Sequence, residues 1–323
     1  MPTFGYLLPT REIASSTDGP ESVARTRTEV VENAARAEAA GFGAVWVGDS
    51  LVAKPRHAPL VTLAAVAERT AAADVGTAIY LPSLRHPLPV AQATATLDQL
   101  AGGRLRLGVG VGVGPDVRHE YDQLDLPYRR RGRLLNEHLD VLRTLWTEET
   151  VTHSGEFYDL EDASVGVRPS SEPPVYVASL GLEDGESFHP LIEERIRRHG
   201  DGWLPGQLAP ETYATGLATF RDLVAEGGRE PAARDALLYL DVLVGSEAEC
   251  RHAAERFMDR YYPDDGTQTV EELLETVVLG RPEAVAERIG AFVDAGVEEF
   301  VVRFPTDDQH RQLRRFREVL PAT

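Results

Sequence analysis

The sequence predicts an α/β fold of the (β/α)8 TIM-barrel class, formed by a single domain over residues 1–323 with a hairpin or loop region inserted at about 148–173. Three observations predict this class. The length suits one large barrel. Short runs of apolar and β-branched residues alternate with longer segments of helical character. No linker composition separates two halves, so a doubly wound sheet with a second domain is the less favoured alternative.

Eight short runs, rich in apolar and β-branched residues, predict the strands. They are 4–8, 43–48, 75–81, 104–111, 175–178, 202–204, 237–244 and 299–304. Segments without helix breakers predict helices at 21–40, 60–73, 128–146, 187–199, 211–226, 247–260, 270–275, 282–295 and 309–320. Strand, helix and strand in this order imply parallel pairs with right-handed crossovers.

The stretch 75–114 contains one complete strand–helix–strand unit. Pro82 and Pro87 close its first strand, and Gly102 ends the helix where a positive φ is needed, as Gly41 does earlier in the chain. Loops at the carboxyl ends of parallel strands carry the ligand sites of such folds. We therefore expect the site at 82–87 and at the glycine-rich segment 108–114.

The remaining segments are predicted to be irregular. Residues 148–173 break the strand–helix rhythm, and 155–158 with 165–167 predict an irregular hairpin. Residues 11–20 and 115–127 are expected to be loops, and 263–266 a turn.

Composition excludes several classes of function. The hydrophobic content is 42% and the formal net charge is −19, which argues against nucleic acid or an anionic membrane as a partner. No apolar run is long enough to span a bilayer. The one cysteine, Cys250, fits a reducing cytoplasm and leaves no disulfide framework.

One glycine-rich segment resembles two known phosphate-binding motifs without matching either. The segment 108–114 (GVGVGVG) has Val113 where a dinucleotide fingerprint needs its third glycine, and it lacks the lysine of a P-loop. Gly108 and Gly110 either allow close packing of a neighbouring layer or serve a ligand, and both readings stay open. Gly112 and Gly114 lie past the strand end, where bare backbone can approach a flat ring or a phosphate.

Other chemistry-bearing patterns are weak. Ser179-Leu180-Gly181 lacks the first glycine of a nucleophile elbow, because Val177 occupies that position. No H-E-x-x-H motif occurs, so no metal site is predicted. The arginines at 129–133 are either a solvated helix start or the neighbours of an anion, since basic residues fit poorly with a helix N-terminus.

Candidate catalytic residues lie at two strand ends. Asp49 and Ser50 directly follow the predicted strand 43–48, so they should project from the barrel mouth, although Asp also commonly caps turns. His86 lies in the adjacent mouth loop, where a structural role is equally well supported.

Several segments together cover nearly the whole chain and carry a resemblance. They are 40–50 (AGFGAVWVGDS), 75–87 with its LRHP, 95–104 leading into the glycine-rich segment, 128–146, 155–158, 201–203 and 295–300. With them the chain resembles the bacterial luciferase-like superfamily of flavin- or deazaflavin-dependent oxidoreductases. The resemblance implies a barrel with a flavin-type ring over the carboxyl ends of its strands.

The resemblance also implies cofactor-binding residues. The ring is expected to rest on a bulge with a non-proline cis peptide at Thr77–Ala78. The phosphate end is expected beside Val111-Gly112 and Ser179-Leu180-Gly181, whose backbone N–H groups can bind an anion. Arg303, at the end of the last strand, is a weaker candidate for the same anion.

The chain departs from the luciferases proper in two places. Those proteins carry histidines at the positions of Asp49 and Ser50, so light emission is not expected. The segment 181–190 (GLEDGESFHP) is longer and more acidic than the usual short turn, which leaves the phosphate contacts after Ser179 open.

The resemblance implies, first, a reduced-FMN-dependent monooxygenase that uses O2 on a small organic substrate, with a separate flavin reductase as partner. Asp49 would act at the ring face, and Ser50 and His86 would position substrate. The alternatives are a coenzyme F420-dependent hydride-transfer oxidoreductase, a non-catalytic flavin-binding barrel, and a barrel lyase or hydrolase. A homo-oligomer is left open.

Overall fold

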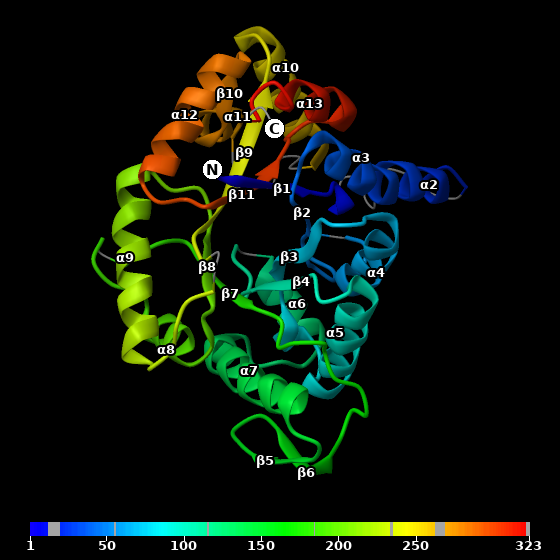
Figure 1. The fold of residues 1–323 in the computed structure, drawn as a ribbon, viewed down its shortest axis with the longest axis vertical. Coiled ribbons are helices and arrows are strands. Elements are labelled where there is room, and N and C mark those ends of the chain that lie inside the picture. Colours follow the sequence, from blue (N-terminus) through cyan, green and yellow to red (C-terminus); the bar gives the residue numbers. More distant parts are fainter. Residues whose placement is uncertain are drawn as a thin grey trace.

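The protein is built around one curled parallel sheet of nine strands. The computed structural model describes residues 1–11, 20–54, 56–114, 116–183, 185–232, 235–261 and 269–320. The strand order is β10-β9-β11-β1-β2-β3-β4-β7-β8. The strands are β1 (Thr3–Leu7), β2 (Ala44–Val47), β3 (Asp74–Tyr80), β4 (Leu105–Val109), β7 (Val175–Ser179), β8 (Gly202–Pro205), β9 (Leu237–Val244), β10 (Val278–Gly280) and β11 (Glu299–Arg303). Helices surround this sheet (Figure 1).

All eight predicted strands are present within a few residues, and the parallel order is confirmed. The sheet has nine strands where the predicted (β/α)8 barrel has eight, and β10 is the additional strand. The first part of β9 pairs with β11, and Val242–Val244 pairs with β10 instead. The edge strand β8 approaches the start of β9 at the bridge from Trp203 to Ala236, where Trp203 N–H donates to the Asp235 carbonyl at 2.7 Å. Among the described residues this is the one bridge that links β8 to the β9 side of the curled sheet.

The helices follow the strands as predicted. They are α2 (Pro20–Arg25), α3 (Glu32–Ala40), α4 (Pro59–Arg69), α5 (Pro87–Ala101), α6 (Val117–Gln123), α7 (Arg131–Thr147), α8 (Pro190–His199), α9 (Pro210–Glu226), α10 (Glu247–Tyr261), α11 (Val270–Thr276), α12 (Pro282–Asp294) and α13 (Gln309–Phe316), with a π-helical turn at Thr26–Val31 and 3-10 turns at Pro82–Leu84 and Tyr128–Arg130. Proline opens α4, α5, α8, α9 and α12, where a missing N–H costs nothing. Gly41 and Gly102 end their helices with positive φ, as expected.

Two predictions about irregular segments were wrong in part. The expected loop 115–127 contains α6, which buries Val117, Glu120 and Tyr121 on one face. The inserted region is a hairpin of β5 (Val151–Ser154) and β6 (Asp159–Ala163), with 155–158 as its turn and no strand at 165–167. The predicted turn 263–266 and most of the predicted loop 11–20 lie outside the described residues.

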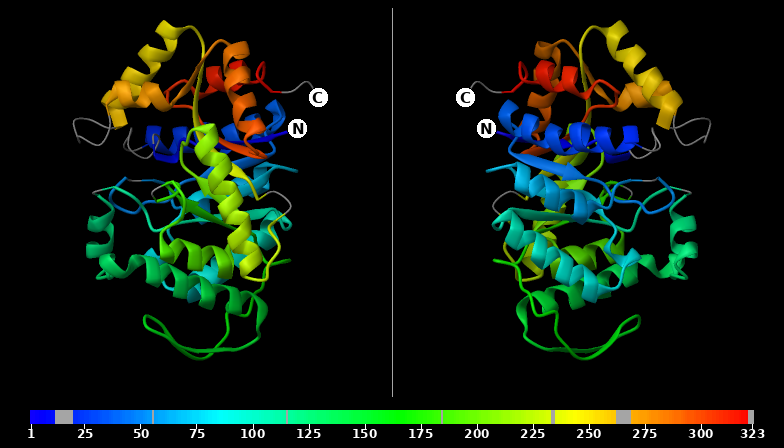
Figure 2. Two further views of the ribbon diagram at one scale, coloured as in Figure 1. Left: turned by 90° about the vertical axis from the view of Figure 1, so that its left-hand side faces the viewer. Right: turned by 90° about the vertical axis from the view of Figure 1, so that its right-hand side faces the viewer.

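The hairpin β5–β6 stands at one end of the molecule, at the bottom of Figures 1 and 2, and α10 lies at the opposite end. The Glu137 carboxylate of α7 accepts hydrogen bonds from the backbone N–H groups of Glu156, Phe157 and Tyr158, which fixes the hairpin turn. The insertion therefore packs on α7.

The interior of the curled sheet is filled by large side chains. Trp46 and Tyr176 pack edge to face, with ring centroids 6.3 Å apart. The Arg106 guanidinium lies 5.0 Å from the Trp46 ring and pairs with the Glu299 carboxylate at 2.6 Å. A Cβ at Gly76 would come within 2.4 Å of the Trp46 ring, so glycine is needed for this packing. Because this end of the interior is filled, space for a ligand lies toward the carboxyl ends of the strands.

Among the helices of the described ranges, none combines the length and the apolar character needed to cross a bilayer.

Candidate functional site

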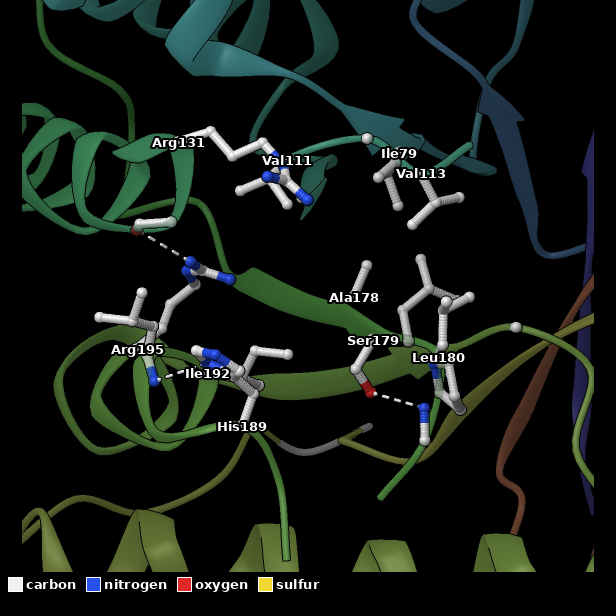
Figure 3. Close-up of a pocket in the computed structure, with 18 of the residues that line it drawn as sticks. Ile79, Val111, Val113, Arg131, Ala178, Ser179, Leu180, His189, Ile192 and Arg195 are labelled. Carbon is white, nitrogen blue, oxygen red and sulfur yellow. Dashed lines mark hydrogen bonds between the residues drawn. The ribbon is translucent and has the colours of Figure 1, made fainter. Parts of the chain in front are cut away.

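A cavity of about 730 Å³ opens at the carboxyl ends of β3, β4, β7 and β8. Its floor is apolar and includes Ala78, Ile79, Ala178, Leu204 and the ring of Tyr239. The loops after β4 and β7 form one rim, and α7 and α8 form a wall (Figure 3). An apolar hollow of this size with few polar groups suits a flat organic ligand.

A bulge in β3 shapes the floor. The pairing of β3 with β4 shifts register between Thr77 and Tyr80, and the Ala78–Ile79 peptide bond is cis. The cis bond is therefore one residue later than the predicted Thr77–Ala78. Thr77 is fully buried, and its hydroxyl donates to the Gly108 carbonyl at 2.9 Å. Of the two predicted residues, Ala78 lines the cavity and Thr77 supports the bulge from below.

The glycines of 108–114 divide into two groups. A Cβ at Gly108 would lie 2.2 Å from the Thr77 carbonyl oxygen, and one at Gly110 would lie 2.4 Å from the Ile79 side chain. Close packing thus accounts for these two. Gly112, with φ of +75°, lines the cavity beside Val111, and Gly114 also has a positive φ. The left-handed conformation at Gly112 turns bare backbone toward the hollow.

The loop after β7 carries three more of the predicted cofactor-binding residues. Ser179, Leu180 and Gly181 all line the cavity. The Ser179 hydroxyl accepts a hydrogen bond from the Trp203 indole at 2.9 Å and one from the Gly181 N–H at 3.3 Å. Figure 3 shows Leu180 and Val113 at the cavity from their two loops. The structure thus brings Val111, Gly112 and 179–181 together at one hollow.

Arg303 lies elsewhere. It lines a small neighbouring cavity of about 40 Å³, which shares Ala78 and Tyr239 with the large one. The Asp241 carboxylate accepts from its guanidinium at 2.6 and 2.5 Å. Its positive charge is therefore already neutralised, which makes it a poor anion ligand.

Asp49 follows β2, as predicted, but it does not line the cavity. Its buried carboxylate accepts two hydrogen bonds from the Arg85 guanidinium, at 2.6 and 3.0 Å, and one from the Leu81 N–H at 3.1 Å. Arg85 in turn lies over the Tyr80 ring at 4.8 Å. Asp49 thus ties the end of β2 to the loop that follows β3.

Ser50 has a partner that the sequence did not indicate, the buried Glu120 of α6. One oxygen of the Glu120 carboxylate accepts from the Ser50 hydroxyl at 2.5 Å and from the Leu51 N–H at 2.7 Å. The N–H groups of Val52 and Ala53 point at the same oxygen. Glu120 therefore fixes the loop after β2, and it was missed because its segment was expected to be a loop.

His86 is exposed and caps the N-terminus of α5. Its Nδ1 accepts from the Leu88 N–H at 3.3 Å, and its ring packs edge-on against Tyr158 at 5.5 Å. The three candidate catalytic residues are thus not brought together, and none of them lines the cavity.

Three arginines give the helical wall a positive charge: Arg129 and Arg131 from the predicted basic run, and Arg195 of α8. Arg195 is only 2% exposed, and burial lowers its pKa to about 10. Arg130 instead pairs with Glu156 of the hairpin at 2.6 Å. The sequence does not indicate Arg195, because a helical pattern predicts the helix but not which cavity in the folded protein its side chains line.

The described part of the chain holds no group of three His, Cys, Asp or Glu residues arranged to bind a metal ion.

Comparison with known proteins decides the family. The profile described as luciferase-like monooxygenase matches residues 2–299. The chain belongs to the luciferase-like monooxygenase family. The expected resemblance is thereby confirmed, and the chain is placed among oxidoreductases.

Curated relatives within this family include three F420-dependent glucose-6-phosphate dehydrogenases. The one from Kineococcus radiotolerans is 31% identical, over 89% of this chain and 90% of the relative. Those from Kribbella flavida and Amycolatopsis mediterranei are 30% and 29% identical, over 90% and 91% of this chain and 92% and 93% of the relatives.

Solved structures of the luciferase-like fold match as well. The monooxygenase RslO1 from Streptomyces bottropensis has a TM-score of 0.79 at 22% identity, with 98% of both chains covered. An F420-dependent secondary alcohol dehydrogenase has a TM-score of 0.75 at 22% identity, with 99% of this chain and 98% of the other covered. At this level of identity the likeness shows the fold alone.

Proposed function

We propose that the protein is a coenzyme F420-dependent oxidoreductase that transfers hydride between its cofactor and a small organic substrate. The observation that carries this proposal is the F420 dependence of relatives that match about nine-tenths of the chain at 29–31% identity. Structural neighbours that are FMN-dependent or other monooxygenases match at 16–22% identity. The relatives thus favour the deazaflavin alternative over the reduced-FMN monooxygenase that the sequence alone puts first.

The cavity fits a cofactor of this kind. Coenzyme F420 joins a flat, largely apolar ring to an acidic tail. The floor at Ile79, Ala178 and Leu204 offers an apolar surface for the ring, and the wall at Arg131 and Arg195 offers positive charge for the tail. A chain with a net charge of −19 that gathers arginines in one hollow is suited to an acidic ligand there.

When bound, the deazaflavin ring supplies the carbon that accepts or gives up hydride. The chain's own residues bind, orient and exclude water. The bulge at Ala78 and Ile79 sets the height of the floor, and the Asp49–Arg85 pair and Glu120 hold the loops of the rim. Hydride carries both electrons, so on this proposal no separate flavin reductase is needed. We also propose that the curled sheet acts as a complete (β/α)8 barrel around the ligand.

Equilibrium titration of the purified protein with F420 and with FMN, followed by cofactor fluorescence, tests this proposal. We expect F420 to bind at least about tenfold more tightly, which is a difference of about 1.4 kcal/mol. Ala178→Phe should abolish F420 binding, because the phenyl ring would occupy the space above the cavity floor. Ala225→Phe, on the exposed face of α9, should leave F420 binding unchanged. Tighter binding of FMN would favour the monooxygenase.

A further inference from the structure

The geometry points to an oxyanion-binding subsite on the helical wall of the cavity, centred on Arg195 and completed by Arg131 and Arg129. It would bind a phosphate or carboxylate group of the ligand. This inference rests on the proposed function, since it assigns the part of the cavity that receives the acidic group. It is separate from the backbone N–H groups at 179–181 that the family resemblance indicates.

Arg195 is buried but has no acidic partner among the residues that the structure describes. Its Nε donates to the Asn136 side-chain oxygen at 2.9 Å, and its Nη2 donates to the Gly132 carbonyl at 3.2 Å. A guanidinium has five N–H donors, so three remain for a ligand. A buried charge is stable only when it is paired and hydrogen-bonded, so this arrangement calls for an anion.

Asn136 sets the direction of the Arg195 guanidinium. Its side-chain oxygen holds Nε, while its amide donates to the Leu191 carbonyl and to the Glu194 carboxylate, both at 3.2 Å. Figure 3 shows the guanidinium groups of Arg195 and Arg131 extending from the helical wall toward the same hollow. The protein's own groups thus fix the orientation of the guanidinium, which lowers the entropic cost of binding an anion there.

Arg131 is the second cation of the subsite. Its Nη1 donates to the Tyr128 carbonyl at 3.2 Å, its guanidinium stacks on the Tyr128 ring at 4.2 Å, and its buried Nε has no partner in the described ranges. Arg129 is exposed on the same wall. Arg130 and Arg133 point to Glu156 instead. The run at 129–133 therefore divides between the cavity and the hairpin.

The chemistry of these groups selects the class of ligand. Planar guanidinium groups bind phosphate and carboxylate through paired N–H bonds, and their strength increases where water is excluded. Val111 and Ile192 provide apolar neighbours beside the arginines. In the part of the lining that the structure describes, the acidic residue is the exposed Glu183, on the loop after β7. A ligand that joins an apolar ring to an oxyanion matches both parts of the cavity.

Inorganic phosphate tests the subsite without relying on redox function. Phosphate should raise the melting temperature of the wild-type protein above that in chloride at equal ionic strength, because a ligand of the native state stabilises it. Arg195→Gln should lose most of this shift. Arg131→Gln should lose part of it and serves as the second variant if Arg195→Gln does not fold. Arg133→Gln, an exposed arginine of the same run, should keep the full shift.

Two further titrations identify the source of the oxyanion. In one, F420 is compared with its ring fragment that lacks the acidic tail; in the other, glucose 6-phosphate is compared with glucose. If the tail occupies the subsite, Arg195→Gln lowers the affinity for F420 about tenfold or more and leaves the affinity for the ring fragment unchanged. If a phosphorylated substrate occupies the subsite, Arg195→Gln lowers only the affinity for glucose 6-phosphate, and the affinities for glucose, F420 and the ring fragment stay the same. That result also supports the subsite.

If Arg195→Gln lowers the affinity for F420 and for the tailless fragment equally, Arg195 has a merely structural role and the inference is overturned. The inference also fails if phosphate does not raise the melting temperature of the wild-type protein. If phosphate stabilises the protein through Arg195 but neither F420 nor the fragment binds, the subsite stands and the proposed function fails.

Discussion

Asp49 and Ser50 each bind a neighbouring loop through a different partner. Asp49 holds the Arg85 guanidinium and the Leu81 N–H, and Ser50 donates to Glu120. Both side chains are almost fully buried. In the structure these residues position loops at the carboxyl ends of the strands, and their roles toward a ring or a substrate stay predictions.

Asp49→Asn should destabilise the protein by about 1–3 kcal/mol. Breaking an ion pair reduces the free energy of unfolding by about 3–5 kcal/mol when both partners are buried. We expect a smaller loss here because the Arg85 side chain is 24% exposed. Urea unfolding of Asp49→Asn, Arg85→Met and the double variant measures the coupling between the two residues. Purely additive single effects would contradict a structural pair.

His138 should make the protein less stable in acid. Burial, with the positive charges of His86 and Arg85 in addition, lowers its pKa to about 3. The unfolded chain binds a proton below about pH 6.5 and the native His138 does not, so native stability is complete above that pH and falls toward pH 3. At pH 5 the loss from this group is about 2 kcal/mol.

Urea unfolding of wild type and His138→Gln, at pH 7.5 and at pH 5, checks this effect. The wild type should lose about 2 kcal/mol more than the variant between the two values. The same pH dependence in both proteins would assign acid sensitivity to other groups, for example the buried His199, whose pKa burial also lowers.

At the scale of elements, β3 and β4 act as one unit under the cavity. The bulge in β3 brings the Thr77 carbonyl against Gly108, and the Ile79 side chain against Gly110. β4 then leads directly into Val111 and Gly112 at the rim. Glycine is thus needed at Gly108 in β4 and at Gly110 just after its end for the floor to take its shape.

Gly108→Ala should reduce the free energy of unfolding by about 2–3 kcal/mol, because its Cβ would lie 2.2 Å from the Thr77 carbonyl oxygen and the backbone must move. Gly43→Ala is a matched control, since a Cβ there meets no atom within 4 Å. Thermal unfolding of both variants compares them. Equal stability of the two would mean that β3 and β4 do not pack as closely as described.

The sequence predicts those elements whose signal is local. The eight main strands are apolar runs, and Gly41 and Gly102 supply the positive φ of their helix caps. The sequence does not indicate β10, because three residues are too few to show a pattern. It does not indicate α6 either, because a helix of seven residues spans only about two turns, too few for a clear amphipathic period.

The site was predictable to the same extent. The family resemblance indicates Val111, Gly112 and 179–181, and the structure brings them to one cavity, while their binding of a cofactor stays a prediction. Glu120 and Arg195 were missed because their roles depend on contacts with residues about 60 to 70 positions away, which no local pattern encodes. The cis bond was placed one residue early because resemblance fixes the bulge better than the register within it.

At the scale of the whole molecule, filled and open regions divide the sheet interior. Trp46, Tyr176 and Arg106 occupy the end near the strand N-termini, and the cavity lies at the other end between two rim loops and a cationic helical wall. The chain is strongly acidic overall, yet this wall is basic. Charge distribution and shape together favour one acidic, ring-bearing ligand at one place.

The most direct test of an F420-dependent hydride transfer is cofactor reduction measured with and without oxygen. Purified protein is mixed with F420 and a panel of sugar phosphates and alcohols, under argon and in air, and the visible absorbance of the oxidised cofactor is followed. We expect F420 to be reduced by at least one donor at the same rate under both gases. Oxygen consumption that requires reduced FMN, without any reduction of F420, would contradict the account.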